Sequence, residues 1–205
     1  MPDIPFLSYS NYLKSLYGRP AFRVGIDAGF SCPNRIEGRA SPGCTYCDAF
    51  GARAVYQRTE GCLSDTVDAN LQDDIRKQTL RAVEFLKKRY KAELFLLYFQ
   101  AFSNTYGEAG FLKALYDFSL SLNEYKELIV STRPDCIDRR KAELLASYKD
   151  RGLDVWVELG LQSSNNLTLQ RINRGHDTDA FLKARGLLKE FSQVIPIPPD
   201  DCKIS

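Results

Sequence analysis

Three cysteines that lie close together in the sequence have the residue type and the spacing of metal ligands. Cys32 and Cys44 are separated by eleven residues, and Cys44 and Cys47 by two. A two-residue gap lets a tight turn direct two thiolates at one metal centre. The longer segment contains Gly38, Pro42 and Gly43, so it can turn back and bring Cys32 to the other two. The pattern predicts a metal centre held by thiolates.

The number of thiolates distinguishes two kinds of metal centre. A structural zinc site takes four protein ligands, so zinc would need Cys62 or Asp48 here, because the only histidine, His176, is distant in the sequence. Thiolates are the usual ligands of an iron–sulfur cluster, and three of them leave one iron open. The count favours the cluster. A zinc site and a chance grouping of buried cysteines remain as alternatives.

Alternating strand and helix patterns must position these cysteines. We expect strands at about residues 22–27, 94–99, 128–130 and 153–161. We expect helices at about residues 8–17, 66–90, 109–120, 138–150, 165–172 and 177–191. Strands that alternate with helices of this length form right-handed βαβ units and a parallel sheet. The fold class is therefore α/β.

The loops that follow the expected strands are polar or rich in glycine. They cover residues 28–61, 100–106, 132–136 and 160–164. Ligands bind at the carboxyl ends of the strands in parallel α/β sheets, where such loops meet. We therefore expect one site at this edge of the sheet, with the cysteine loop as part of it. On the last strand, Trp156 and Glu158 are predicted to share a face by the period of two.

Length, charge and hydropathy limit the function classes. The chain has 205 residues with 28 Lys and Arg against 26 Asp and Glu, a net charge of +2. This length favours one domain, and the charge gives no case for bulk binding to nucleic acid or membranes. The longest apolar run has six residues, and the start lacks the pattern of a signal peptide. We expect a cytoplasmic protein with reduced thiols, and no membrane span.

Five stretches together resemble a radical S-adenosylmethionine (radical SAM) subfamily with a wide first cysteine gap. They are residues 26–35 (IDAGFSCPNR) with 43–47 (GCTYC), 98–106 (YFQAFSNTY), 131–136 (STRPDC), 156–165 (WVELGLQSSN) and 169–176 (LQRINRGH). The later stretches are similar to the core of the elongator catalytic subunit and of oxygen-independent coproporphyrinogen oxidase. The resemblance covers about residues 20–190 and is specific because the motifs occur in order.

The resemblance implies a partial TIM-type barrel of parallel strands with outer helices. It also implies a [4Fe–4S] cluster on Cys32, Cys44 and Cys47, with SAM chelating the free iron. An electron from the cluster then cleaves the sulfonium and yields a 5′-deoxyadenosyl radical, which abstracts hydrogen from a substrate that the sequence does not name. A one-electron donor such as a flavodoxin or ferredoxin is the expected partner. We expect a single core domain over residues 1–205, with a helical extension over 1–20.

Several further residues match cofactor contacts of the family. Tyr46 matches an aromatic position beside the adenine, with loop packing as its alternative role. Ser103, Asn104 and Thr105 stand where many relatives carry a glycine-rich turn for the methionine amino group, so here their hydroxyl and amide groups would make those hydrogen bonds. Gln100 lies at the strand end just before them and is a further candidate.

The later motifs supply four more candidates. Relatives often carry an acid after strand three that holds the ribose hydroxyls, but Ser131 stands at that place, with Arg133 two residues later as a candidate contact. Glu158 is a candidate substitute for the acid, its alternative role being an ion pair with Arg133 or Arg174. Gln162 and Arg174 match positions that contact the ribose and the carboxylate, for which arginine is a natural bidentate partner.

The end of the chain departs from the family pattern. Pro196, Pro198 and Pro199 cannot donate hydrogen bonds to a sheet, so at most residues 193–195 form a stub of strand five. The sequence thus predicts a barrel cut short after about strand four or five. We expect such a chain to ligate the cluster but to cleave SAM weakly or not at all. A non-catalytic zinc module and a tRNA-modifying enzyme are the other functions considered, and the near-neutral charge disfavours the second.

Overall fold

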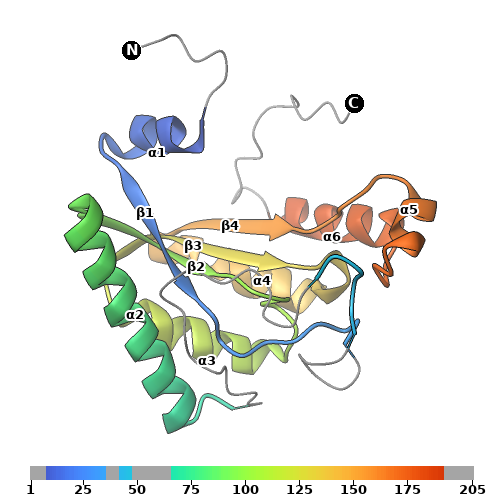
Figure 1. The fold of residues 1–205 in the computed structure, drawn as a ribbon, viewed down its shortest axis with the longest axis horizontal. Helices are drawn as coiled ribbons and strands as arrows, with labels where there is room; N and C mark the ends of the chain where they lie inside the picture. Colours follow the sequence, from blue (N-terminus) through green and yellow to red (C-terminus); the bar gives the residue numbers. More distant parts are fainter. Residues whose placement is uncertain (1–7, 36–41, 48–65, 192–205) are drawn as a thin grey trace.

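Four parallel strands form one sheet in the order β1-β2-β3-β4 (Figure 1). The strands are β1 (Ala21–Ile26), β2 (Leu94–Phe99), β3 (Tyr125–Thr132) and β4 (Asp154–Leu159). This computed structural model describes residues 8–35, 42–47 and 66–191. Neighbouring strands are joined by segments that contain helices, as βαβ units require. The α/β class and the partial TIM-type barrel are therefore confirmed.

The helices lie close to their predicted positions. They are α1 (Tyr9–Tyr17), α2 (Ala69–Tyr90), α3 (Ala109–Leu120), α4 (Arg139–Ser147), α5 (Asn166–Arg171) and α6 (Thr178–Glu190), with 3₁₀ turns η1 (Pro134–Cys136) and η2 (Lys149–Arg151). Five helices begin after a side chain that accepts a backbone N–H, which stabilises the first turn. No helix in the described part of the chain is long and apolar enough to cross a membrane.

Several elements differ from their predicted bounds by up to three residues, and two of these differences have a clear cause. The helix expected over 138–150 ends at Ser147 and tightens into η2 before Gly152, whose φ is 79°, a common way for helices to finish. Strand β3 begins at Tyr125, three residues earlier than expected. Its first residues include Lys126 and Glu127, so the apolar run from which the strand was predicted starts only at Leu128. The expected stub at 193–195 lies outside the described residues, and the single-domain organisation stays a prediction.

One face of the sheet carries the main hydrophobic core, under α2, α3, α4 and α6. Alternate strand residues such as Val24, Leu97, Phe99 and Val130 are fully buried in it. The ring of Tyr116 on α3 packs against Phe99, with 4.9 Å between ring centroids. This packing holds the strands in register, and so it holds the loops at their carboxyl ends.

The opposite face of the sheet, called the inner face below, is covered near the start of the strands by α1 (Figure 1). Leu13 of α1 packs with Leu96 and Ile129 in a second, smaller apolar cluster. Tyr12 of α1 meets Trp156 of β4 edge to face, at 5.9 Å between ring centroids. The remainder of the inner face is polar, which distinguishes it from the core face.

A β-bulge in β3 decides which of its residues face inward. Phe95 pairs with Tyr125, but Leu97 pairs with Leu128, so β3 has one extra residue between these pairs. The extra residue reverses the alternation of side chains. Tyr125 and Leu128 both join the core face, and Glu127 contacts α1 on the inner face through Tyr17.

A substitution in the core face tests its contribution to stability. Leu97 is fully buried, whereas Leu80 of α2 is 63% exposed. We expect Leu97→Ala to lower the free energy of unfolding by about 2–5 kcal/mol through lost burial and a cavity. The matched control Leu80→Ala should change it by less than about 0.5 kcal/mol. Chemical denaturation followed by circular dichroism measures both, and equal effects would contradict the assignment of the core.

Candidate functional site

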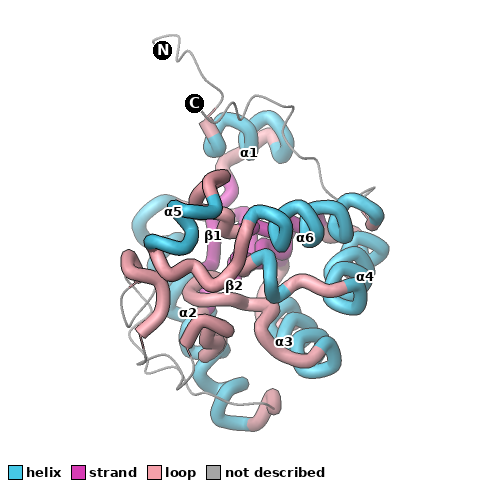
Figure 2. The backbone as a smooth tube through the Cα atoms, turned by 90° about the vertical axis from the view of Figure 1, so that its right-hand side faces the viewer, coloured by secondary structure: helices cyan, strands magenta, loops and turns pink. Residues whose placement is uncertain are grey.

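The loops after the four strands gather at one end of the sheet (Figure 2) and surround a cavity of about 410 Å³. Each of the four loops expected to form the site contributes lining residues. Eight of the predicted site residues line the cavity: Cys32, Cys44, Tyr46, Cys47, Gln100, Arg133, Gln162 and Arg174.

The cysteine loop is held by the segment that follows α5. The backbone N–H of Thr45 donates to the carbonyl of Ile172 at 3.0 Å. The side chain of Asn173 donates to the carbonyl of Gly43 at 2.9 Å. Asn34 donates to the carbonyl of Asn173 at 2.5 Å, which ties the first part of the loop to the same segment. A segment about 130 residues away in sequence therefore fixes the positions of the cysteines.

Gly175 in this segment has a backbone conformation that favours glycine, and its neighbour Asn34 leaves no room for a side chain. Its φ is 74°, in the left-handed region that glycine enters without strain. A Cβ at this position would lie 2.6 Å from Oδ1 of Asn34, closer than any normal contact. The absence of a side chain at Gly175 therefore leaves room for Asn34, whose amide contacts both Asn173 and Cys44.

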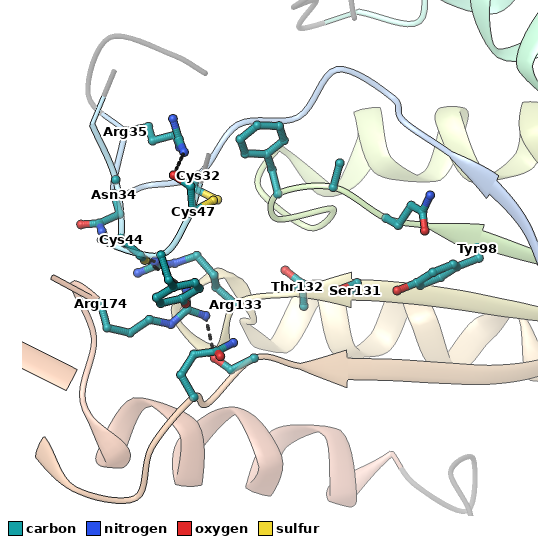
Figure 3. A pocket seen from close by; sticks show the side chains of 17 residues that line it. Cys32, Asn34, Arg35, Cys44, Cys47, Tyr98, Ser131, Thr132, Arg133 and Arg174 are labelled. Atoms are coloured by element: carbon teal, nitrogen blue, oxygen red, sulfur yellow. Dashed lines mark hydrogen bonds between the residues drawn. The ribbon is translucent and has the colours of Figure 1, made fainter. Parts of the chain in front are cut away.

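Cys44 is the cysteine with the most polar surroundings. Nη1 of Arg174 lies 3.5 Å and Nη1 of Arg133 lies 3.9 Å from its sulfur, and Nδ2 of Asn34 lies at 3.5 Å. Figure 3 shows both guanidinium groups extending toward this cysteine. Burial alone raises the pKa of a thiol, but the hydrogen bond and charge of Arg174 outweigh it and lower the pKa of Cys44. The thiolate, the form that ligates metal, is therefore favoured.

The other thiols have different surroundings. The sulfur of Cys32 lies 3.4 Å from Oγ of Ser103, and burial raises its pKa despite that hydrogen bond. Burial raises the pKa of Cys136, the last residue of η1, to about 12, so this thiol stays protonated. Cys62 lies outside the described residues.

The described residues do not form a site for a single metal ion. Within residues 8–35, 42–47 and 66–191, no three His, Cys, Asp or Glu side chains lie close enough together to hold one ion. A [4Fe–4S] cluster distributes its ligands over several iron atoms, so its thiolates stand further apart than those of a zinc site. Cys62 and Asp48, which a zinc site would need as a fourth ligand, lie outside the described residues.

The two arginines are both buried, and they differ in how their donors are used. Arg133 is 3% exposed and makes a bidentate pair with Asp135, at 2.8 and 2.7 Å. Arg174 is 6% exposed and donates to the carbonyl of Gly160 at 2.6 Å. The Nε of Arg174 is buried with no hydrogen-bond partner among the described residues. An unmet donor on a buried cation fits an anionic ligand such as a carboxylate.

Three residues that line the cavity have backbone conformations that are uncommon for their type. Ala101, Phe102 and Gln162 have φ values of 70°, 61° and 76°. A non-glycine residue in the left-handed region costs free energy and persists only where the surroundings impose it. Such conformations gather at binding sites, and here they shape two of the loops at the cavity.

Three residues predicted to contact SAM after β2, Ser103, Asn104 and Thr105, do not line the cavity. Thr105 is fully buried, and its hydroxyl contacts Thr132 at 2.7 Å and donates to the carbonyl of Cys136 at 2.9 Å. Asn104 is fully buried and donates to the carbonyls of Ala101 and Ser131. These groups brace the loops after β2 and β3 against each other, so the structure gives them a supporting position. Ser103, also fully buried, reaches the site through Cys32.

Glu158 has a partner that the sequence analysis missed. One carboxylate oxygen lies 2.8 Å from Arg23 of β1, and the other accepts from the hydroxyl of Tyr98 at 2.8 Å. The predicted ion pair of Glu158 with Arg133 or Arg174 is therefore wrong. Both of those arginines extend toward the sulfur of Cys44 instead. Arg23 is a lone charge inside a strand, a signal that could have marked it as facing a polar interior.

Comparisons with known proteins agree with this site. The sequence profile of the Radical SAM superfamily matches residues 32–195. The chain belongs to the radical SAM superfamily. It is 35% identical over 179 residues to the uncharacterized protein MJ0486 of Methanocaldococcus jannaschii, covering 87% of this chain and 51% of that protein. Identity is 33% over 180 residues to protein YhcC of Escherichia coli K12 and 31% over 179 to the uncharacterized protein YtqA of Bacillus subtilis, each covering 87% of this chain and 52% of the relative.

Membership in the radical SAM superfamily has consequences for cofactors and chemistry. It implies a [4Fe–4S] cluster and SAM as cofactors, and an enzyme that takes an electron from a reductant and acts on a substrate. The chain spans about half the length of the curated relatives it matches. Superfamily membership therefore does not specify the substrate or the partners of the whole protein.

Replacing one cysteine of the site tests the ligand set. We expect Cys44→Ala to abolish retention of a reconstituted cluster, because two thiolates hold a cluster poorly. Iron and sulfide analysis with absorption spectroscopy measures retention. The matched control is Cys136→Ala, a buried thiol outside the cavity lining, which should keep the iron content of the wild type. Full iron content in Cys44→Ala would rule out this cysteine as a ligand.

Proposed function

We propose that this chain is the cluster- and SAM-binding core of a radical SAM enzyme, with Cys32, Cys44 and Cys47 as the ligands of a [4Fe–4S] cluster. The observation that carries the proposal is the shared cavity, where these cysteines stand beside two buried arginines. The donor set fits the cluster because thiolates bind iron and nearby cations compensate their charge. When bound, the cluster and SAM supply a one-electron cleavage of the sulfonium that generates a 5′-deoxyadenosyl radical.

The arginines of the site have separate roles in this proposal. Arg174 binds the carboxylate of SAM, because its Nε is buried without a partner among the described residues. Arg133 is held by Asp135 and directs a positive charge toward the sulfur of Cys44. A cation at this place favours the thiolate and stabilises a negatively charged group in the cavity.

The other lining residues are proposed to orient SAM. Gln162 and Gln100 offer amide groups at the carboxyl ends of β4 and β2, and they are proposed to contact the ribose and the amino group. Tyr46 stands between two of the cysteine ligands, and its ring is proposed to pack beside the adenine. Its pKa is raised by burial to about 12, so the phenol remains neutral next to the thiolates.

The electron donor and the substrate are the remaining parts of the proposed function. A flavodoxin or ferredoxin is the proposed electron donor, since both deliver single electrons at low potential. A tRNA substrate is the alternative considered from the sequence, but the net charge of +2 gives it no support. Retention on immobilised tRNA at moderate salt separates a nucleic acid substrate from a small molecule.

Reductive cleavage of SAM is the decisive test of the proposed function. The protein is reconstituted anaerobically with iron and sulfide, reduced with dithionite and incubated with SAM, and 5′-deoxyadenosine is measured by chromatography. We expect slow formation of 5′-deoxyadenosine by the wild type, in line with the weak cleavage expected from the sequence, and none by Cys44→Ala. A colourless protein with stoichiometric zinc, or a reduced cluster that produces no 5′-deoxyadenosine, would contradict the proposal.

Binding of SAM tests the residues proposed to hold it. We expect Gln162→Ala to weaken binding by about 1–3 kcal/mol, since a polar partner of SAM is left unmet. Arg174→Met should weaken it further, because a charge pair is lost. Calorimetry on the reconstituted protein measures both. Gln170→Ala and Arg171→Met on the exposed side of α5 are matched controls and should bind as the wild type does. Unchanged binding in Gln162→Ala or Arg174→Met would exclude that residue from the SAM site.

A further inference from the structure

Two carboxylates stand side by side on the inner face of the sheet, at the end opposite the cavity. Glu127 of β3 and Asp154 of β4 are register partners in the parallel ladder. The bulge in β3 turns Glu127 toward this face, away from the core face. Like charges at neighbouring positions on a sheet face repel each other. The register therefore creates an electrostatic conflict that the structure must relieve.

A single phenol stands between the two carboxyl groups. The hydroxyl oxygen of Tyr17, at the end of α1, lies 2.8 Å from Oε1 of Glu127 and 2.9 Å from Oδ2 of Asp154. A phenol has one hydrogen to donate, so it can serve only one of two ionised carboxylates. Both contacts are hydrogen bonds only if one of the carboxyl groups carries a proton and donates it to the oxygen of Tyr17.

Burial identifies which carboxyl group carries the proton. Glu127 is fully buried, and its Oε2 has no hydrogen-bond partner among the described residues. Asp154 is exposed to solvent, where water stabilises a negative charge. A buried carboxylate with an unmet oxygen costs far more free energy than a hydrated one. The proton belongs on Glu127.

We propose that Glu127 is a neutral carboxylic acid in the folded protein and that it latches α1 onto the sheet. Glu127 donates its proton to Tyr17, and Tyr17 donates its own to Asp154, which keeps the negative charge. This chain of two hydrogen bonds joins β3, α1 and β4 and contains a single charge. Loss of the proton from Glu127 leaves two carboxylates around one donor and releases the end of α1.

The groups that surround Glu127 agree with a retained proton. Burial, with the nearby charge of Asp154, raises the pKa of Glu127, while Tyr17, Arg23 of β1 and Tyr9 of α1 act in the opposite sense and do not reverse it. Burial also raises the pKa of Tyr17, which therefore keeps its proton. Arg23 is engaged at 2.8 Å by Glu158, further along the inner face.

The direction of the pKa shift sets how the latch depends on pH. A proton held more tightly in the folded than in the unfolded chain stabilises the fold while it is bound. The contribution of Glu127 is complete below its ordinary pKa of 4.5 and is lost as the pH rises through the raised pKa. The latch is thus closed in acid and opens toward alkaline pH.

Contacts connect the latched helix to the wall of the cavity. The ring of Tyr9 on α1 lies over the guanidinium of Arg23, at 4.6 Å, and the ring of Tyr98 lies over it at 4.5 Å. Glu158 binds both Arg23 and Tyr98, and Tyr98 lines the cavity. Release of α1 removes Tyr9 from this group, so protonation of Glu127 controls the packing of one wall of the cavity.

Trp156 provides a direct readout of the latch. It is the only tryptophan of the chain, and Tyr12 of α1 packs against it. In the full 205-residue chain without cofactors, we expect its emission to move to longer wavelength in one step as the pH rises above 4.5. Glu127→Gln keeps the shape and the donor of a neutral acid, so its emission should stay at the acid value throughout. Asp154→Asn should move the step to lower pH, since a charge that opposes ionisation is gone.

One control variant and a second measurement test the latch independently. Glu143→Gln, on the exposed side of α4, should titrate as the wild type does. A step that persists unchanged in Glu127→Gln would assign it to another group. A Glu127→Gln emission at the alkaline value at every pH would show that a neutral side chain at this position does not hold α1. Either result would overturn the proposal. Carbon-13 NMR of the glutamate carboxyl groups in the wild type requires no substitution. One glutamate should keep the chemical shift of a protonated acid above pH 4.5, and its absence would overturn the proposal.

Discussion

A thiolate inside a protein requires positive charge close by, and the surroundings of Cys44 depend on this constraint. Its sulfur lies within 4 Å of two guanidinium groups, from Arg133 and Arg174. Buried cations are themselves costly unless they have partners. Arg133 therefore needs Asp135, and Arg174 needs the carbonyl of Gly160. The loops after β3 and β4 are fixed by these requirements of the cysteine loop.

The two faces of the sheet perform different tasks. The core face is packed against α2, α3, α4 and α6 with side chains that are almost all apolar, and it supplies most of the stability through burial. The inner face carries Arg23, Glu127 and Glu158, which are held by tyrosines from α1 and β2. Polar groups in such a place need partners, so they specify the position of α1 more narrowly than apolar packing would.

Support of the site by distant residues explains how short loops keep their shape. Thr105 and Asn104 tie the loop after β2 to the last residues of β3. The segment after α5 ties down the cysteine loop and depends on the missing side chain at Gly175. Binding groups placed in advance lose less entropy when a ligand arrives. Asn104 also donates to the carbonyl of Ala101, one of the residues with an uncommon φ value.

The sequence by itself determined the strands, the helices and the cysteine motif. Apolar runs such as residues 94–99, helical periodicity and capping residues act between close neighbours in the chain. The order of strands and helices then determined that the loops would meet at one edge of a parallel sheet. For these reasons the α/β class and the place of the cysteine loop could be predicted from local patterns.

Only the tertiary structure decided which polar groups meet. Arg174 and Cys44 are 130 residues apart in the chain. The lone charge of Arg23 indicates a polar surrounding, but only the paired strands bring Arg23 rather than Arg133 or Arg174 to Glu158. The side on which Glu127 lies depends on one extra residue in β3, which is visible only once the strand is paired. Pair choice and register depend on distances that exist only after the sheet has formed, because a shift of one residue turns a side chain to the other face.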